Sequence, residues 1–353
     1  MVARSVDGGR RPTIRDVAQQ AGVSRGTVSR VLNGGTFVSQ EARRKVEAAI
    51  AETGYVVSHS ARSLATGRAG SIGFLLTEPQ QLLFEDPNFS TLYRAAAAAL
   101  ARRDLPLVLM VAGTSAERTQ VLRYIEGGHV DGVMLVSSHA GNPVVEALLG
   151  AGVPTVACGV PLGFEDRLGY VAADDRRGGR EMTQHLQAQG ARRLAMISGP
   201  SDTSGGRERL TGFLEATGVG RNEAWIEHAD YTRAGGYTAA RRLLEQHSDL
   251  DGLFVASDLM AMGALEALKE AGRRVPDDVL VGGFDDSTYA AQSQPSLTTM
   301  RQPFERISEE MTRLLLGVVE GEDPAAVVLP TTLVVRESTQ CVSHAPSGAS
   351  ARA

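Results

Sequence analysis

The sequence contains little cysteine and little lysine. Only two of its 353 residues are cysteines, Cys158 and Cys341, and they lie far apart without C-x-x-C spacing. This scarcity argues against a disulfide framework and against a zinc site, and it fits a reducing cytoplasm. Lysine occurs only at Lys45 and Lys269, so arginine carries nearly all of the positive charge.

Long apolar runs and several catalytic motifs are also absent. No stretch of about 18 apolar residues occurs, so we expect no transmembrane helix and no membrane contact. The first residues, MVARSVDGGRRPTIRD, lack the apolar region of a secretory signal, which favours a cytoplasmic location. There is no Walker loop, no G-x-G-x-x-G after a strand and no H-E-x-x-H. We therefore predict a protein that is not an enzyme and that needs no metal or cofactor.

Charge is distributed unevenly along the chain. Residues 1–68 carry eleven Arg or Lys against five Asp or Glu, a net charge of +6, so the other 285 residues carry −11 of the total of −5. A basic segment on an acidic body is typical of a protein that binds a polyanion. A solvated basic tail would give the same asymmetry, and charge alone does not separate the two.

A short stretch near the N-terminus, TIRDVAQQAGVSRGTVSRVLN (residues 13–33), predicts two helices joined by a tight turn. Thr13 is a candidate N-cap for the first helix, and Ser24 for a second helix over 25–32. Gly22 allows the turn because it carries no Cβ. This pattern is typical of a helix-turn-helix, whose second helix enters the major groove of DNA. Similar two-helix units also occur in other all-helical domains.

The outward face of the second helix carries Arg25, Gly26, Ser29 and Arg30. Arginine can bond the O6 and N7 atoms of guanine with two parallel hydrogen bonds. A third helix is predicted from Ser39 to Gly54. Residues 58–66, SHSARSLAT, have a short apolar edge, but a helix this short is marginal alone and needs a partner.

Residues 13–75 resemble the head of the LacI/GalR repressors, through D-V-A-x-x-A-G-V-S-x-x-T-V-S-R-V-x-N and the later A-R-x-L. The resemblance implies a DNA-binding head, a hinge helix and a sugar-binding-protein-like body that work as a homodimer on a double-stranded operator. It also implies that the hinge helices pair and wedge Leu64 into the minor groove, although Leu64 could instead pack on the body as a linker contact. The predicted DNA contacts are Thr13, Ser24, Arg25, Gly26, Thr27, Ser29, Arg30, Asn33, Ser58, Ala61 and Leu64.

From Ser71 onward, buried strands alternate with helices of 10–15 residues, which predicts parallel sheets built from βαβ units. Two such series predict an α/β body of two doubly wound lobes, similar to periplasmic sugar-binding proteins. The resemblance places the chain crossings between lobes near Asp174, Thr299 and Pro330. The expected parts are a head at 1–57, a hinge at 58–68, a body at 69–340 and a disordered tail at 341–353. Lobe 1 then spans 69–172 and 301–329, and lobe 2 spans 173–300 and 330–340.

Ligands of open α/β sheets bind beyond the carboxyl ends of the strands, so we expect a ligand between the lobes. Carboxylates and arginine suit a sugar because each can hold two hydroxyls, and aromatic faces suit its apolar side. The residue pattern and the resemblance together predict effector contacts at Asn88, Phe89, Asp175, Arg209, Tyr231, Ser257, Asp285 and Phe304. Some of these residues could instead have structural roles such as helix capping. Ser257 stands where the family usually has Asn, and the polar Asn88 favours a sugar over a flat base.

These observations predict a repressor that a sugar releases from a pseudo-palindromic operator. The segment FLLTEPQQLLFEDPNFSTLYRAA is similar to family members that respond to cellobiose or other β-glucosides. Two alternatives stay open: a regulator activated by a non-sugar corepressor, and a sugar receptor with no role on DNA.

The C-terminal segment has no leucine heptad to join dimers into a tetramer. Adjacent carboxylates at Asp285 and Asp286 do not flank a bond as a glycosidase requires.

Overall fold

The computed structural model describes residues 12–32, 38–55 and 67–340. The chain divides at Gly70 into two compact units, which we call the head and the body. Four predicted DNA contacts, Asn33, Ser58, Ala61 and Leu64, lie outside the described residues, as do most of the predicted hinge and the whole predicted tail.

The head contains three helices, α1 (Ile14–Ala21), α2 (Arg25–Leu32) and α3 (Gln40–Thr53). Val17, Val28 and Val46 are fully buried, one from each helix. They recur at helical spacing with smaller residues on the same faces, and this pattern gives each helix one apolar stripe. The three stripes form the small core of the head.

Local side chains set the ends of the head helices. The Asp16 carboxylate accepts hydrogen bonds from Thr13 N and Thr13 Oγ1, both at 2.7 Å. Gly22 ends α1 with a left-handed φ of 64°, a conformation that glycine adopts without the usual Cβ penalty. Thr27 N donates to Ser24 Oγ at 3.1 Å, which caps the start of α2. The predicted helix-turn-helix is therefore present.

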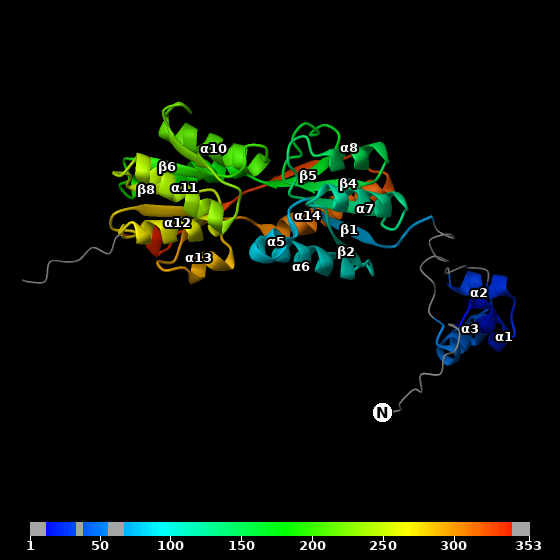
Figure 1. The fold of residues 1–353 in the computed structure, drawn as a ribbon. Coiled ribbons are helices and arrows are strands. Elements are labelled where there is room, and N and C mark those ends of the chain that lie inside the picture. The colour runs from blue at the N-terminus through cyan, green and yellow to red at the C-terminus, as the bar shows by residue number, and fades with distance from the viewer. Residues whose placement is uncertain (1–11, 33–37, 56–66, 341–353) are drawn as a thin grey trace, which may run out of the picture. The chain divides into compact units, whose positions relative to one another are not determined.

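The body consists of two lobes, each built on a six-stranded sheet (Figure 1). The first sheet has the order β11-β5-β4-β3-β1-β2, and all of its neighbouring strands are parallel. Its strands are β1 (Ile72–Leu76), β2 (Leu107–Val111), β3 (Gly132–Val136), β4 (Thr155–Cys158), β5 (Gly169–Ala173) and β11 (Ala326–Leu329).

The second sheet has the order β12-β10-β9-β8-β6-β7 and is parallel except for the antiparallel pair β10–β12. Its strands are β6 (Leu194–Ser198), β7 (Trp225–His228), β8 (Gly252–Val255), β9 (Leu280–Asp285), β10 (Thr298–Arg301) and β12 (Thr332–Val334). The predicted fold class, an all-α head followed by two doubly wound lobes, is confirmed.

Helices cover both sheets and connect the strands. The first lobe carries α5 (Gln80–Glu85), α6 (Pro87–Ala101), α7 (Ser115–Glu126), α8 (Pro143–Gly150) and α14 (Phe304–Glu320). The second lobe carries α9 (Asp175–Ala188), α10 (Ser204–Thr217), α11 (Arg233–Gln246), α12 (Asp258–Glu270), α13 (Thr288–Gln292) and the short 3₁₀ helix η1 (Glu337–Thr339). Within the described part of the chain, no helix combines the length and the hydropathy needed to cross a membrane.

Strands buried on both faces read as continuous apolar runs, as β1, β3 and β8 do. The chain passes from one sheet to the other after β5, after β10 and after β11. The carboxyl ends of the central strands and the beginnings of α6, α9, α10 and α12 thus meet between the lobes. This meeting point is where the candidate ligand site lies.

Candidate functional site

A cavity of about 160 Å³ lies between the two lobes. All eight residues that the sequence predicts for the effector line it: Asn88, Phe89, Asp175, Arg209, Tyr231, Ser257, Asp285 and Phe304. They come from helices, strands and loops of both lobes, which face each other across the cavity. Their contact with an effector stays a prediction.

Arg209 is the central cation of this cavity. It is only 6% exposed, and its Nε donates to Asp175 Oδ1 at 2.8 Å while Nη1 donates to the Ala256 carbonyl at 2.6 Å. Its guanidinium also lies 3.8 Å from the centre of the Phe284 ring. Burial alone would lower the pKa of Arg209, but Asp175 and the other anions nearby outweigh burial and raise it. Arg209 is therefore held rigidly and stays charged.

Two glycines bring Arg209 close to Asp175. A Cβ on Gly179 of α9 would lie 2.4 Å from the Arg209 carbonyl oxygen, and one on Gly212 of α10 would lie 2.2 Å from the Arg176 carbonyl oxygen. Both distances are far below van der Waals contact, so α9 and α10 pack this closely only with glycine at these positions. The close packing sets the salt bridge that orients Arg209.

Asp285, at the end of β9, links the two lobes. It is 5% exposed; Oδ2 accepts from Asn88 Nδ2 of α6 at 3.0 Å and Oδ1 accepts from Gln302 Nε2 at 2.7 Å. Arg209 Nη1 lies 3.6 Å from Oδ1. Burial, opposed by Arg209, raises the pKa of Asp285 to about 6. A ligand hydroxyl at this carboxylate would therefore bond at a point where both lobes already meet.

The neighbouring Asp286 has a different role. Its two carboxylate oxygens accept from Arg301 Nε and Arg336 Nη2, each at 2.6 Å. Arg301 is the last residue of β10, and Arg336 lies two residues after β12. Asp285 and Asp286 have positive φ angles of 119° and 57°, which turn the two side chains into different surroundings. Asp286 does not line the cavity.

Three aromatic residues, Phe89, Phe304 and Tyr231, also line the cavity. Tyr231 has a left-handed φ of 63°, and its ring lies directly against Gly199, where a Cβ would be 2.3 Å from the Tyr231 Cζ atom. Its hydroxyl lies 3.4 Å from Thr203 Oγ1. Apolar ring faces beside buried carboxylates and a guanidinium match the two kinds of surface that a sugar presents.

Sequence reasoning missed several lining residues, of which Asp86 and Gln302 matter most. Asp86 caps α6 by accepting from Asn88 N at 2.9 Å, and its position before Pro87 is a capping signal that the sequence does show. Gln302 lies just after β10, on a crossing segment, and is found only when that segment is placed against Asp285. Ser257 lines the cavity, but its hydroxyl also caps α12 by accepting from Met260 N at 3.3 Å.

A second contact between the lobes lies beside the cavity. His139, between β3 and α8, has Nε2 2.9 Å from Glu78 Oε1 of its own lobe and Nδ1 3.0 Å from Asp202 Oδ2 of the other lobe. Ala140 N donates to the Asp202 carbonyl at 2.7 Å. The hydrogen bond to Glu78, helped by the two carboxylate charges, outweighs burial and raises the pKa of His139 to about 9. His139 is therefore a cation at neutral pH.

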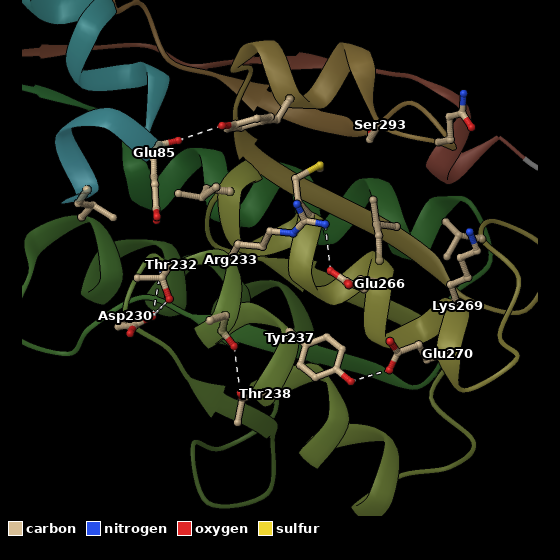
Figure 2. Close-up of a pocket in the computed structure, with 18 of the residues that line it drawn as sticks. Glu85, Asp230, Thr232, Arg233, Tyr237, Thr238, Glu266, Lys269, Glu270 and Ser293 are labelled. Atoms are coloured by element: carbon tan, nitrogen blue, oxygen red, sulfur yellow. Dashed lines mark hydrogen bonds and ion pairs between the residues drawn. The ribbon is translucent and has the colours of Figure 1, made fainter.

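A larger hollow of about 1900 Å³ adjoins this cavity, shares Glu78 and Leu82 with it, and extends over α11, α12 and the ends of α5 and α13. Figure 2 shows its surface pairs, Arg233 with Glu266 and Tyr237 with Glu270. Arg233, Glu266 and Glu270 are exposed and Tyr237 is half-buried, and the members of each pair are already bonded to each other. Neither Arg209 nor Asp285 lines this hollow. The smaller cavity, with its buried charges, is the better candidate for a ligand site.

In the head, α2 presents the side chains that the sequence assigns to DNA. Ser24, Arg25, Gly26 and Arg30 are exposed or nearly so, whereas Thr27 and Ser29 are half-buried. Thr27 and Ser24 also bond through their hydroxyls at 2.9 Å. The buried face of α2, with Val28 and Val31, fixes which residues point outward. Exposed arginines on the second helix of a helix-turn-helix can reach base edges in the major groove.

The comparisons with known proteins cover both units. Residues 13–58 match the family model for bacterial regulatory proteins of the lacI family, and residues 183–339 match the periplasmic binding protein-like domain. The HTH-type transcriptional regulator CelR of Thermobifida fusca is 43% identical over 93% of this chain and 98% of its own length. A ribose operon repressor of Halalkalibacterium halodurans is 35% identical, over 93% and 97%.

Solved structures agree with these matches. The transcriptional regulator CelR–cellobiose complex has 42% identity and a TM-score of 0.75, covering 93% of this chain and all of that one. The lac repressor dimer bound to operator and the anti-inducer ONPF has 27% identity and a TM-score of 0.81, covering 94% and 100%. Fold and site thus define a DNA-binding transcriptional regulator with a ligand-binding body. The chain belongs to the lacI family of bacterial regulatory proteins.

Proposed function

We propose that this chain is a cytoplasmic homodimeric repressor whose two heads bind a pseudo-palindromic operator, and that a sugar bound between the lobes releases it. The parts assigned to these roles are the head at 1–57, the hinge at 58–68 and the two-lobed body at 69–340. The dimer is supported by the likeness to the lac repressor dimer bound to operator. Two-fold symmetric heads would contact half-sites about one helical turn, ~34–36 Å, apart.

The proposed DNA contacts among the described residues are Thr13, Ser24, Arg25, Gly26, Thr27, Ser29 and Arg30; the others proposed are Asn33, Ser58, Ala61 and Leu64. Exposed Arg25 and Arg30 on α2 support this role. Arginine reads guanine with paired hydrogen bonds, so these two residues would supply most of the base discrimination.

The observation that carries the sugar assignment is the set of bonds at Asp285. One buried carboxylate gathers Asn88, Gln302 and Arg209 from both lobes, beside the rings that line the cavity. This is the donor and acceptor mixture that ring hydroxyls require. The CelR–cellobiose complex, at 42% identity, supports a β-glucoside such as cellobiose as the effector.

The same site supports binding rather than catalysis. Asp286 is fully engaged by Arg301 and Arg336, so it does not form a catalytic pair with Asp285. Burial raises the pKa of Cys158, the cavity's thiol, to about 12, which leaves it protonated and a poor nucleophile.

An effector acts only through its different affinity for two states of the protein. The interlobe bonds Asn88–Asp285, His139–Asp202 and Tyr289–Glu85 are formed only when the lobes hold their present arrangement. A sugar that binds one arrangement more tightly would shift the population of the whole dimer, including its heads.

The test begins with selection of a duplex from random oligonucleotides by the purified protein. Fluorescence anisotropy on the selected duplex should show binding that weakens steeply with salt and is lost on adding cellobiose. A protein without preference for any duplex would contradict the repressor role. Operator binding that cellobiose strengthens would instead identify a corepressor.

A further inference from the structure

The cavity between the lobes carries an unequal number of charges of the two signs. Its charged lining residues are Glu78, Asp86, Asp175, Arg209 and Asp285, so Arg209 is the only cation among the described residues of its wall. Four carboxyl groups therefore surround one guanidinium in a space of about 160 Å³.

Pairing leaves part of this negative charge uncompensated. Asp175 holds Arg209 at 2.8 Å, and Glu78 is paired with His139 at 2.9 Å. Asp285 lies farther from Arg209, at 3.6 Å. Asp86 accepts one hydrogen bond from Asn88 N, and among the described residues no ion pair involves it. Burial, and next the charge of Asp285, raise the pKa of Asp86 to about 7, as expected where two carboxyl groups share one site.

Helix N-termini could counter this charge, because they favour anions such as phosphate. Four helices begin at the cavity: α6, α9, α10 and α12. In each of them, however, a side chain of the protein already occupies a first-turn N–H group. The occupied groups are Asn88 N by Asp86, Arg177 N by Asp174, Gly206 N by Thr203 and Met260 N by Ser257. At each of these four helix starts a side chain of the protein therefore already takes one of the N–H groups that an anion would use.

We propose that this cavity selects an uncharged sugar and rejects phosphorylated or carboxylated sugars, and that Asp86 is a residue that sets this selectivity. The inference rests on the proposed sugar site and specifies its ligand further. Asp86, at the start of α6 in the first lobe, would bond a ligand hydroxyl, whereas a ligand anion there would meet Asp86 and Asp285 together. The effector must then be produced by a reaction or transport step, such as uptake or hydrolysis, that does not add a phosphate to the glycoside.

The extent to which the cavity disfavours an anionic sugar follows from Coulomb's law. A like charge about 4 Å from a carboxylate, at an effective dielectric of about 20, weakens binding by on the order of 1000-fold. Solvent at the cavity mouth reduces this effect, so we expect a difference of about 100-fold or more between a neutral sugar and its phosphate.

Isothermal titration of the full chain at pH 8.5, where Asp86 and Asp285 are both ionised, with cellobiose and with cellobiose 6′-phosphate tests the proposal. Cellobiose should bind at least about 100-fold more tightly. In Asp86→Asn this ratio should shrink at least tenfold; Asn also caps helices well, so the start of α6 is preserved. The control is Asp249→Asn, an exposed carboxylate paired with Arg193 far from the cavity, which should leave the ratio unchanged.

A phosphate that binds as tightly as cellobiose, or an Asp86→Asn ratio equal to that of the native chain, overturns the proposal. If glucose binds better than cellobiose, glucose and glucose 6-phosphate are the pair to compare. Cellobiose and cellobionate form the corresponding pair for a carboxylated sugar. For either pair, equal affinity of the neutral and the anionic sugar, or an unchanged ratio in Asp86→Asn, overturns the proposal. Anisotropy on the selected operator keeps the two ideas apart. If cellobiose binds at least about 100-fold more tightly than its phosphate but does not release the operator, the repressor mechanism fails and the charge selectivity stands. If the phosphate binds as tightly as cellobiose and releases the operator, the charge selectivity fails and the repressor mechanism stands.

Discussion

The ion pair of His139 with both lobes predicts a pH-dependent stability of the body. We expect His139→Gln to lose the attraction of the imidazolium to Glu78 and Asp202 while keeping a side chain that can hydrogen bond. The folded-state pKa of His139 is about 9, against an ordinary value of 6.5. Because the folded-state pKa is raised, the ion pair stabilises fully below about pH 6.5, and this contribution disappears as pH rises through 9.

The size of the effect follows from the same shift. Raising the pKa from about 6.5 to about 9 corresponds to about 3 kcal/mol at most. The His139 side chain is 28% exposed and that of Asp202 is 51% exposed, so water and salt screen part of the attraction. We therefore expect His139→Gln to lower the free energy of unfolding by about 1–2 kcal/mol at pH 6 and by close to zero at pH 10.

Urea unfolding of the native chain and of His139→Gln, each at pH 6 and pH 10, measures this difference directly. Comparing the unfolding free energies of the two proteins at the same pH removes the contribution of other titrating groups, which both proteins share. Asp202→Asn separates the interlobe half of the contact, since Glu78 belongs to the same lobe as His139. A destabilisation of equal size at both pH values would show that His139 is not held as a cation, and the reasoning from the two carboxylates would fail.

Three further predictions concern the two proposed binding sites. Arg25→Ala should weaken binding to the selected operator by about 1–3 kcal/mol and relax the preference at one base pair, measured by anisotropy on single-base variants; an unchanged preference would remove Arg25 from base reading. Gly199→Ala should abolish cellobiose binding in calorimetry while the protein stays folded, because the new Cβ would lie 2.3 Å from the Tyr231 ring and displace it; native affinity would show that this ring is dispensable. Asp285→Ala should bind operator normally but resist release by cellobiose, and ordinary release would place the effector elsewhere.

The head could be predicted from the sequence because local rules determine its structure. Helix α2 begins after Ser24 and ends at Leu32 as its capping and apolar spacing predict. Gly22 has the positive φ that the turn requires. These features involve residues within a few positions of one another, so no knowledge of tertiary packing is needed to find them.

Elements at the sheet edges were harder to predict. Strand β7 (Trp225–His228) and strand β11 (Ala326–Leu329) do not follow the buried apolar pattern of central strands, because an edge strand has neighbours on one side only. The short helices α5 and α13 have too few turns to show a period. Their formation depends on the strands and loops that they pack against.

Individual residues of the cavity could be predicted from strand ends and from the family resemblance, but the bonds between them could not. Asp285 and Asn88 were both predicted, whereas the bond that joins them spans 197 positions in the sequence. Gln302, which was missed, reaches Asp285 from a segment that crosses between the lobes. The sequence pattern also does not distinguish Asp285 from Asp286. Only the backbone angles show that the first faces the cavity and the second faces Arg301 and Arg336.

This division between adjacent carboxylates bears on how the ligand site is coupled to the rest of the body. A ligand hydroxyl at Asp285 would compete with Asn88 of the other lobe for the same oxygen, so occupancy would alter an interlobe bond directly. Asp286, one peptide further, binds Arg301 at the end of β10 and Arg336 after β12, and it is held in a strained left-handed conformation. A ligand in the cavity would therefore act on a carboxylate that one peptide unit joins to the Asp286–Arg301 pair, at the end of β10 where the chain crosses between the lobes.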